Sequence, residues 1–376
     1  MAEFEIPRET SLSLDVSAID NTMVKIDDTH VILSYSTSST SVIKTFSLDS
    51  QGRVVTELDA LVHDGAGIAE NHGSLVFIDS THFALAHFDS ASDGHIKTFS
   101  IDGSFVITQI DDLEHDTTEG KHNSLILLDS THLALAYAGP DGDGFVKTFS
   151  FNGTTFGSIT ELNSLEHDTA AGTNNSLVKI DDTHLILAYS GDTVDGFFKT
   201  FAIDGSYIIS EIASLEYDTV GSSAPSLVMI DSTHFFLAYS DSTTVSRIIT
   251  VSIDGNYENI TVLDTLIRSG VIGQGNSVVK IDGTHFILVT TIAGNDGGIV
   301  TFSINGSFVI TEIDSLEHDT NNGDNNSLVM MDATHFILAY KDGSGGAIKT
   351  FTLSAAVCAP SGGNSTRGVS GSGWGW

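Results

Sequence analysis

Histidines and acidic residues recur side by side in this sequence, in two motifs whose side chains could bind a metal ion or transfer protons. The first motif is Asp-x-Thr-His followed by an apolar run, and its histidines are His30, His82, His132, His184, His234, His285 and His335. Asp and Thr in such a motif hydrogen-bond the backbone of a tight turn. We therefore expect these histidines to be structural, each donating to a carbonyl or carboxylate that ties its turn to the next strand. A functional ring of histidines is the alternative.

The second motif is Glu-His-Asp, which precedes a stretch rich in Gly, Asn and Ser. Its complete copies are Glu114-His115-Asp116, Glu166-His167-Asp168 and Glu317-His318-Asp319, and another copy has Tyr217 in place of the histidine. Neighbouring residues of a strand point to opposite sides, so one copy presents at most two of its three groups together. This argues against a transition-metal site. The variation among copies fits a surface role or drift, and we expect these residues on a binding face.

Further acidic residues lie in loops that should emerge on the same face: Asp141, Asp143, Asp192 and Asp195. Such a face would suit Ca²⁺, which takes about six to eight oxygen ligands. No loop has the spaced acidic series of an EF-hand, and the nearest stretch, Asp141-Gly142-Asp143-Gly144, offers two carboxylates. The sequence therefore predicts no specific metal site and no cofactor, with calcium binding as the alternative.

Lysine recurs in a Lys-Thr-Phe motif, at Lys44, Lys97, Lys147, Lys199 and Lys349. Regularly repeated lysines among acidic loops favour ion pairing or a role at strand edges over a binding site. Ile249 and Val300 take the lysine position in two copies, which argues against a required ring of lysines.

The spacing of these motifs predicts the fold. The seven Asp-x-Thr-His histidines are separated by 52, 50, 52, 50, 51 and 50 residues, and a period near 50 with several short strands is typical of propeller blades. The clearest repeat predicts strands at 176–181, 184–189, 197–203 and from 206 to about 215, rich in Ile, Val, Phe, Thr and Tyr. Asp204-Gly205 predicts a two-residue type I′ hairpin. We expect an all-β, seven-bladed β-propeller with four antiparallel strands per blade.

The two ends of the sequence predict how the ring closes. The last repeat provides three strands within 327–354, and the start of the chain resembles the missing fourth: Ser11, Leu12 and Asp15 align with Ser315, Leu316 and Asp319. Residues 3–15 should therefore complete blade 7, which removes an exposed sheet edge. The propeller would span 1–354. Residues 355–376 form a Gly/Ser-rich tail in which Trp374 and Trp376 are candidate interface anchors.

This repeat resembles the seven-bladed propellers of the WD40 and kelch type. The resemblance covers residues 3–354 and is architectural, because the Trp-Asp dipeptide of WD40 blades and the Gly-Gly pair of kelch blades are absent. No activity or partner carries over from those families residue by residue.

Composition and missing motifs argue against several classes of partner and enzyme. A formal net charge of -34, from 49 acidic and 15 basic side chains, disfavours nucleic acid and anionic membranes, because both require clustered Lys and Arg. No apolar run approaches the roughly 18 residues of a membrane span, and residues 1–7 lack the basic and apolar regions of a signal peptide. Motifs of serine hydrolases, phosphate-binding loops and zinc proteases are absent.

We therefore expect a non-enzymatic binding or structural propeller, a surface or virion-type attachment or assembly component that uses the acidic loop face and the tail. Its partners would be a protein, its own subunits through the tail, or a surface glycan, and an extracellular or virion-surface location is favoured. One alternative is a hydrolase-like propeller enzyme with a site in the central channel. The other is a calcium-dependent lectin-like module, although the lack of Trp in the blades removes the best stacking platform for sugars.

Overall fold

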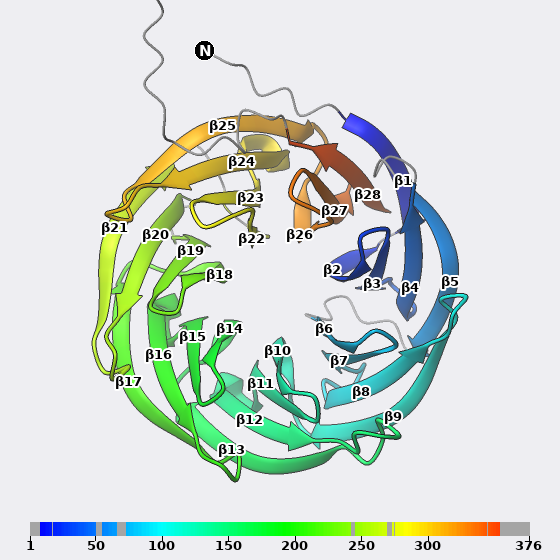
Figure 1. Ribbon diagram of the computed structural model, residues 1–376, viewed down its shortest axis with the longest axis horizontal. Coiled ribbons are helices and arrows are strands. Elements are labelled where there is room, and N and C mark those ends of the chain that lie inside the picture. Colours follow the sequence, from blue (N-terminus) through cyan, green and yellow to red (C-terminus); the bar gives the residue numbers. More distant parts are fainter. Residues whose placement is uncertain are drawn as a thin grey trace, which may run out of the picture.

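In the computed structural model, seven four-stranded antiparallel sheets surround a central channel (Figure 1). The structure describes residues 8–16, 18–49, 55–65, 73–241, 245–268, 273, 275–343 and 345–353. In each blade, the strand that comes first in the repeat lies nearest the channel, and the last strand lies at the outer rim. The predicted all-β, seven-bladed propeller is therefore confirmed.

The strands of the first four blades are as follows. Blade 1 contains β2 (Ile19–Asp27), β3 (His30–Ser36), β4 (Ser41–Leu48) and β5 (Val55–Asp64). Blade 2 contains β6 (Ser74–Asp79), β7 (His82–Phe88), β8 (Gly94–Ile101) and β9 (Ile107–Asp116). Blade 3 contains β10 (Lys121–Asp129), β11 (His132–Ala138), β12 (Gly144–Ser150) and β13 (Thr160–Asp168). Blade 4 contains β14 (Thr173–Asp181), β15 (His184–Ser190), β16 (Gly196–Ile203) and β17 (Ile209–Asp218).

The remaining blades follow the same plan. Blade 5 contains β18 (Ser223–Asp231), β19 (His234–Ser240), β20 (Ser246–Ile253) and β21 (Ile260–Arg268). Blade 6 contains β22 (Ser277–Lys280), β23 (His285–Thr291), β24 (Gly297–Ile304) and β25 (Ile310–Asp319). Blade 7 contains β26 (Asp324–Met330), β27 (His335–Asp342), β28 (Gly345–Thr352) and β1 (Arg8–Val16). Three short 3₁₀ turns lie in loops: η1 (Pro140–Gly142), η2 (Asp192–Val194) and η3 (Ala293–Asn295).

Blade 7 is closed by the first strand of the chain. Figure 1 shows β1, in blue, beside β28, in red, and the two strands are antiparallel. Leu12 pairs with Ile348 just as Leu316 pairs with Ile299 in blade 6, which is the register that the sequence alignment predicts. Leu12 and Leu14 pack against the core cluster between blades 7 and 1. Closure is therefore confirmed for Arg8–Val16, whereas residues 3–7 lie outside the described residues.

The hydrophobic core consists of clusters between neighbouring blades. The second strand of each blade is almost fully buried, because its apolar side chains contact a blade on either side. One cluster, for example, joins Ile287 and Val289 of blade 6 to Phe336 and Leu338 of blade 7, all at most 1% exposed. Burial of this kind is the main stabilising contribution to such a fold.

A circle of hydrogen bonds links the innermost strands around the channel. In every blade, a Ser or Thr hydroxyl accepts a hydrogen bond from a backbone N–H of the next blade, over 2.9–3.3 Å. The donor and acceptor pairs are Leu75–Thr22, Leu125–Ser74, Leu177–Ser124, Leu227–Ser176, Val278–Ser226, Leu328–Ser277 and Met23–Ser327. The last pair joins blade 7 to blade 1, so the circle is complete.

The connection between the two outer strands differs from the predicted two-residue hairpin. In blade 4 the last strand begins at Ile209 rather than at Ser206, so residues 204–208 form the loop. The Asp204 carboxylate accepts hydrogen bonds from the N–H groups of Ser206 and Ile208, and the left-handed residue is Tyr207, with φ of 60°. The prediction was wrong because the side chain of Asp204 stabilises a wider loop.

Candidate functional site

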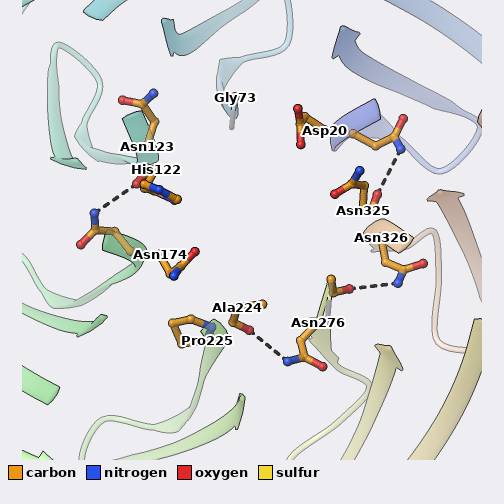
Figure 2. A pocket seen from close by; sticks show the side chains of 13 residues that line it. Asp20, Gly73, His122, Asn123, Asn174, Ala224, Pro225, Asn276, Asn325 and Asn326 are labelled. Carbon is orange, nitrogen blue, oxygen red and sulfur yellow. Dashed lines mark hydrogen bonds between the residues drawn. The ribbon is translucent and has the colours of Figure 1, made fainter. Parts of the chain in front are cut away.

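A polar pocket lies at the mouth of the central channel, where the innermost strands begin. It has a volume of about 250 Å³ and is lined by Asp20, Asn21, Gly73, His122, Asn123, Asn174, Asn175, Ala224, Pro225, Gly275, Asn276, Asn325 and Asn326. Every blade contributes one or two of these residues, and Figure 2 shows them arranged in a ring around the channel axis. We call this feature the axial pocket.

A β-bulge in the innermost strand shapes the rim of the axial pocket. In blade 4, the pairing of β14 with β15 shifts between Thr173 and Ser176, and Asn174 within the shift has φ of 52°. The equivalent residues of five other blades are also left-handed: Asp20, His122, Ala224, Gly275 and Asn325. Asn, Asp and Gly tolerate this conformation best. Bulges of this kind redirect side chains.

The residue after each left-handed position is usually asparagine, and its amide links neighbouring blades. The Nδ2 groups of Asn21, Asn175, Asn276 and Asn326 donate to backbone carbonyls of the preceding blade over 2.9–3.1 Å. The acceptors are Asn325, His122, Ala224 and Gly275, which are the left-handed residues themselves (Figure 2). The asparagines therefore hold the rim of the axial pocket in a fixed geometry.

The side chains of Asp20, His122, Asn174 and Asn325 are the polar groups that this rim carries toward the opening (Figure 2). Amides can donate and accept hydrogen bonds, and a carboxylate accepts them. Among the described lining residues there is no Lys or Arg, and Asp20 is the one carboxylate. This arrangement suits a small molecule with several hydroxyl groups better than an anion.

The acidic members of the Glu-His-Asp motif lie around the axial pocket on the same face. Glu114, Glu166 and Glu317 are exposed. Asp116, Asp168 and Asp319 are half-buried, and each accepts a hydrogen bond from a tyrosine of the next blade over 2.7–2.9 Å. Their other carboxylate oxygens cap N–H groups of the following loop. These aspartates therefore join blades together as well as adding charge to this face.

The histidines of the same motif do not reach the surface. His115, His167 and His318 are 6%, 7% and 0% exposed, and each packs edge-on against a tyrosine of the next blade. They lie above glycines such as Gly144, where an added Cβ would come within 2.6 Å of the His167 ring. Burial, together with the nearby Lys199, lowers the pKa of His167 to about 3, so this ring is neutral. These three histidines, which we expected on the binding face, are therefore part of the protein interior.

The loop aspartates Asp141 and Asp192 are exposed, and Asp143 and Asp195 are half-buried beside them. Their loops contact the loops that follow the Glu-His-Asp motif, through hydrogen bonds such as Gly172 N–H to Gly142 O at 2.8 Å. The two loop sets therefore share one acidic face. Within the described ranges, no three His, Cys, Asp or Glu side chains are grouped closely enough to hold a metal ion.

The Asp-x-Thr-His turns lie at the opposite end of the strands. In blade 4, His184 Nδ1 contacts Asp181 at 3.0 Å, and its ring stacks on Tyr257 of blade 5 with centroids 3.7 Å apart. His30, His82, His132 and His234 stack in the same way on Phe105, Phe156, Tyr207 and Phe308. His285 and His335 make the same contact with an aspartate of their own turn. The tail with Trp374 and Trp376 lies outside the described residues.

Sequence reasoning missed the asparagine rim. The sequence feature that marks the rim is the repeated Asn-Ser pair, such as Asn175-Ser176, which we interpreted as part of a loop. The partner of the Asn175 amide is the carbonyl of His122, which lies 53 residues away in the chain. The role of Asn175 therefore depends on contacts between blades, which form only in the folded ring.

Comparisons with known proteins identify similar folds but no family. No family model matches the sequence, and no curated protein matches it at a significant level. A solved structure from Bacteroides fragilis, provisionally named a 6-phosphogluconolactonase, has a TM-score of 0.62 and 14% identity over 80% of this chain and 85% of that chain. The periplasmic gluconolactonase from Pseudomonas aeruginosa has a TM-score of 0.60 and 9% identity over 87% and 86%.

At these identities the likeness shows the seven-bladed propeller fold and nothing finer. The two structures named above are described as lactonases, and they share the fold with this chain at low sequence identity. The described part of the chain contains no helix with the length and apolar character needed to cross a bilayer.

Proposed function

We propose that this chain is a non-enzymatic binding propeller, used in surface attachment or assembly, and that its axial pocket binds a small uncharged polyhydroxylated group such as a terminal sugar. The observation that carries the proposal is the asparagine rim. Its amides are held by hydrogen bonds to backbone carbonyls of the preceding blade, so the backbone that carries the polar side chains is fixed before a ligand arrives. Such preorganisation reduces the entropy lost on binding.

Size and charge support this ligand class. A cavity of about 250 Å³ lies just below the usual range for drug-sized ligands, about 300–1,000 Å³, so it suits a single sugar ring. A phosphorylated sugar would meet Asp20 and the field of a chain with a net charge of -34. The alternating donors and acceptors of amide groups complement hydroxyl groups.

The test measures binding of D-glucose, D-galactose and N-acetyl-D-glucosamine by saturation-transfer NMR, followed by titration of the best ligand. Asn325→Ala and Asp20→Asn should weaken binding at least tenfold. Alanine is compatible with the rim, because Ala224 occupies the equivalent left-handed position of blade 5. Asp141→Asn, which changes the charge of the same face equally, is the matched control and should bind normally. Failure of all three sugars to bind, or equal binding by all variants, would overturn the proposal.

A lactone hydrolase is the second candidate function. Asp20 and His122 both line the axial pocket, and the structural neighbours include a gluconolactonase. Hydrolysis of D-glucono-1,5-lactone, followed as acid release, separates the two candidates. A rate above background that Asp20→Asn abolishes would replace the binding proposal with the enzymatic one.

A further inference from the structure

The interface between blades 5 and 6 departs from the pattern that most of the other interfaces repeat. In the common pattern, a buried lysine of one blade donates to the carbonyl of the Glu-His-Asp histidine in the preceding blade. Lys147 contacts His115 O at 2.7 Å, and Lys97 and Lys349 make equivalent bonds to His63 and His318 at 2.8 Å. Lys147 also pairs with Glu161, an acid on the outer strand of its own blade, at 3.0 Å.

At the interface of blades 5 and 6, the cation has moved from one strand to another. Val300 occupies the lysine position and Arg268 occupies the histidine position, so the positive charge now comes from the preceding blade. The Arg268 guanidinium reaches Glu312, the acid that corresponds to Glu161, with Nε at 2.9 Å and Nη2 at 3.3 Å. The ion pair is preserved. The shorter Val300 side chain is buried in the core between blades 5 and 6 and is not long enough to fill the space that a lysine fills at this position.

A second exchange occurs beside the first. In blades 3 and 4, a glycine that follows the second strand faces an aromatic ring of the third strand, as Gly191 faces Phe197. Blade 6 reverses this pair: Ile292 stands at the glycine position and Gly298 at the aromatic position, where an added Cβ would meet Ile292 Cγ2 at 2.6 Å. An isoleucine thus replaces a larger aromatic ring.

Together these exchanges leave a cavity of about 410 Å³ that we call the blade 5–6 pocket. It is lined by Arg268, Ile292, Ala293, Gly298, Ile299, Val300, Ser315, Leu316 and Glu317. Its volume falls within the range of small-molecule sites, about 300–1,000 Å³. Five of the nine described lining residues are aliphatic, and Arg268 is the one cation among these nine.

Arg268 has a hydrogen-bond donor that its own contacts leave unused. Its side chain is 12% exposed, and its Nη1 atom is buried without a hydrogen-bond partner among the described residues. A buried polar group without a partner is costly, and such groups in native proteins generally have a partner or a function. Because Nη1 has almost no accessible surface in this structure, an acceptor from outside the chain reaches it only when the Arg268 side chain shifts toward the pocket.

We propose that the blade 5–6 pocket binds a small uncharged molecule that carries a carbonyl-type acceptor on a short aliphatic body. The carbonyl accepts a hydrogen bond from Arg268 Nη1 once that side chain shifts toward the pocket, and the aliphatic part packs on the partly exposed Ile292 and Leu316. An anion is disfavoured, because Glu312 already neutralises the guanidinium, Glu317 lies in the lining, and the chain carries a net charge of -34. This site is separate from the axial pocket, and neither proposal depends on the other.

The experiment uses δ-valerolactam, an uncharged cyclic amide that is stable to hydrolysis, and follows the ¹³C-labelled methyl groups of Ile, Leu and Val by NMR. Saturable shifts are expected at Ile292, Val300 and Leu316. Cyclopentanecarboxylate, a probe of similar size with a negative charge, should bind at least tenfold more weakly. Stronger binding of the carboxylate would overturn the proposed ligand class.

Two variants test the site itself. Arg268→Met removes the donor and should weaken valerolactam binding at least tenfold. The double variant Ile292→Gly/Gly298→Phe restores the glycine–aromatic pair of blades 3 and 4, keeps Arg268, and should abolish binding while the protein stays folded. If the lactam shifts persist in both variants, or are absent from the unaltered protein, the blade 5–6 pocket is not this site.

Discussion

The buried histidines should make this protein sensitive to mild acid. His63 and His167 have a pKa lowered to about 3 by burial and by a nearby lysine, and burial holds the pKa values of His87 and His115 well below their usual range. In the unfolded chain each would titrate near its ordinary pKa of about 6.5. The unfolded state therefore binds more protons, and stability falls as the pH drops below about 6.5 toward the pKa of the folded state.

The size of the stability loss at pH 5 follows from the difference between that pH and the pKa of histidine in the unfolded chain. That difference is about 1.5 pH units, and each unit corresponds to about 1.36 kcal/mol, so each neutral buried histidine costs about 2 kcal/mol at pH 5. His63 and His167 together lower the free energy of unfolding by about 4 kcal/mol, and His87 and His115 add to this loss, compared with a total of about 5–15 kcal/mol for a typical protein. The hydrogen-bonded aspartates, such as Asp129 with a pKa of about 2, add to this loss only at lower pH.

Urea unfolding followed by far-UV circular dichroism at pH 7, 6 and 5 measures this loss. His167→Phe removes one titrating group, and Tyr217 shows that a six-membered ring fits above the corresponding glycine, Gly196, of the next interface. The variant should retain about 2 kcal/mol more of its pH 7 stability at pH 5 than the unaltered protein does. A total loss below about 2 kcal/mol between pH 7 and pH 5, or an unchanged pH dependence in His167→Phe, would refute the reasoning.

Three further predictions concern the ring and the tail. Deleting residues 1–16 removes β1 and exposes the edge of β28, so we expect aggregation in light scattering and a large fall in melting temperature; unchanged melting would contradict the closure. His184→Ala removes the stack on Tyr257 and the contact with Asp181 and should cost about 1–3 kcal/mol of unfolding free energy, whereas sugar binding measured well below the melting temperature should persist. Changing Trp374 and Trp376 to Ala should leave the melting temperature unchanged but lower the particle mass in light scattering; if neither quantity moves, the tail plays no part in assembly.

The features that the sequence predicts well are those that each repeat encodes locally. The spacing of the histidines predicts seven blades, and the alignment of Leu12 with Leu316 predicts the closing register, because the apolar alternation of a strand determines which face packs inward. The Asp204 loop was mispredicted because a side-chain acceptor competes with the shorter hairpin, and the Asp-Gly pair does not reveal that competition.

The site itself depends on contacts between repeats, which no single repeat contains. His167 lies between a glutamate and an aspartate in the sequence, which predicts a surface residue, but it is buried because Gly144 leaves room for its ring. The blade 5–6 pocket likewise requires Arg268 and Glu312, 44 residues apart, to be neighbours. Val300 is an exception to the lysine pattern in the sequence, but only the folded structure shows the pocket that it lines.

The pairing of β1 with β28 also determines the order in which the ring can assemble during synthesis. The ribosome makes β1 before every other strand of the propeller and makes its partner β28 last of them, so β1 stays unpaired until all the other strands have been made. Blades 1 to 6 are each continuous in the chain and can form as they appear, whereas blade 7 cannot. Until then Leu12 and Leu14 have no β28 to pack beside, and an unpaired apolar strand of this kind is prone to join another chain. A second copy translated on the same message would offer its own β28 to that waiting strand, so exchange of β1 between chains is the misassembly to which this architecture is most exposed.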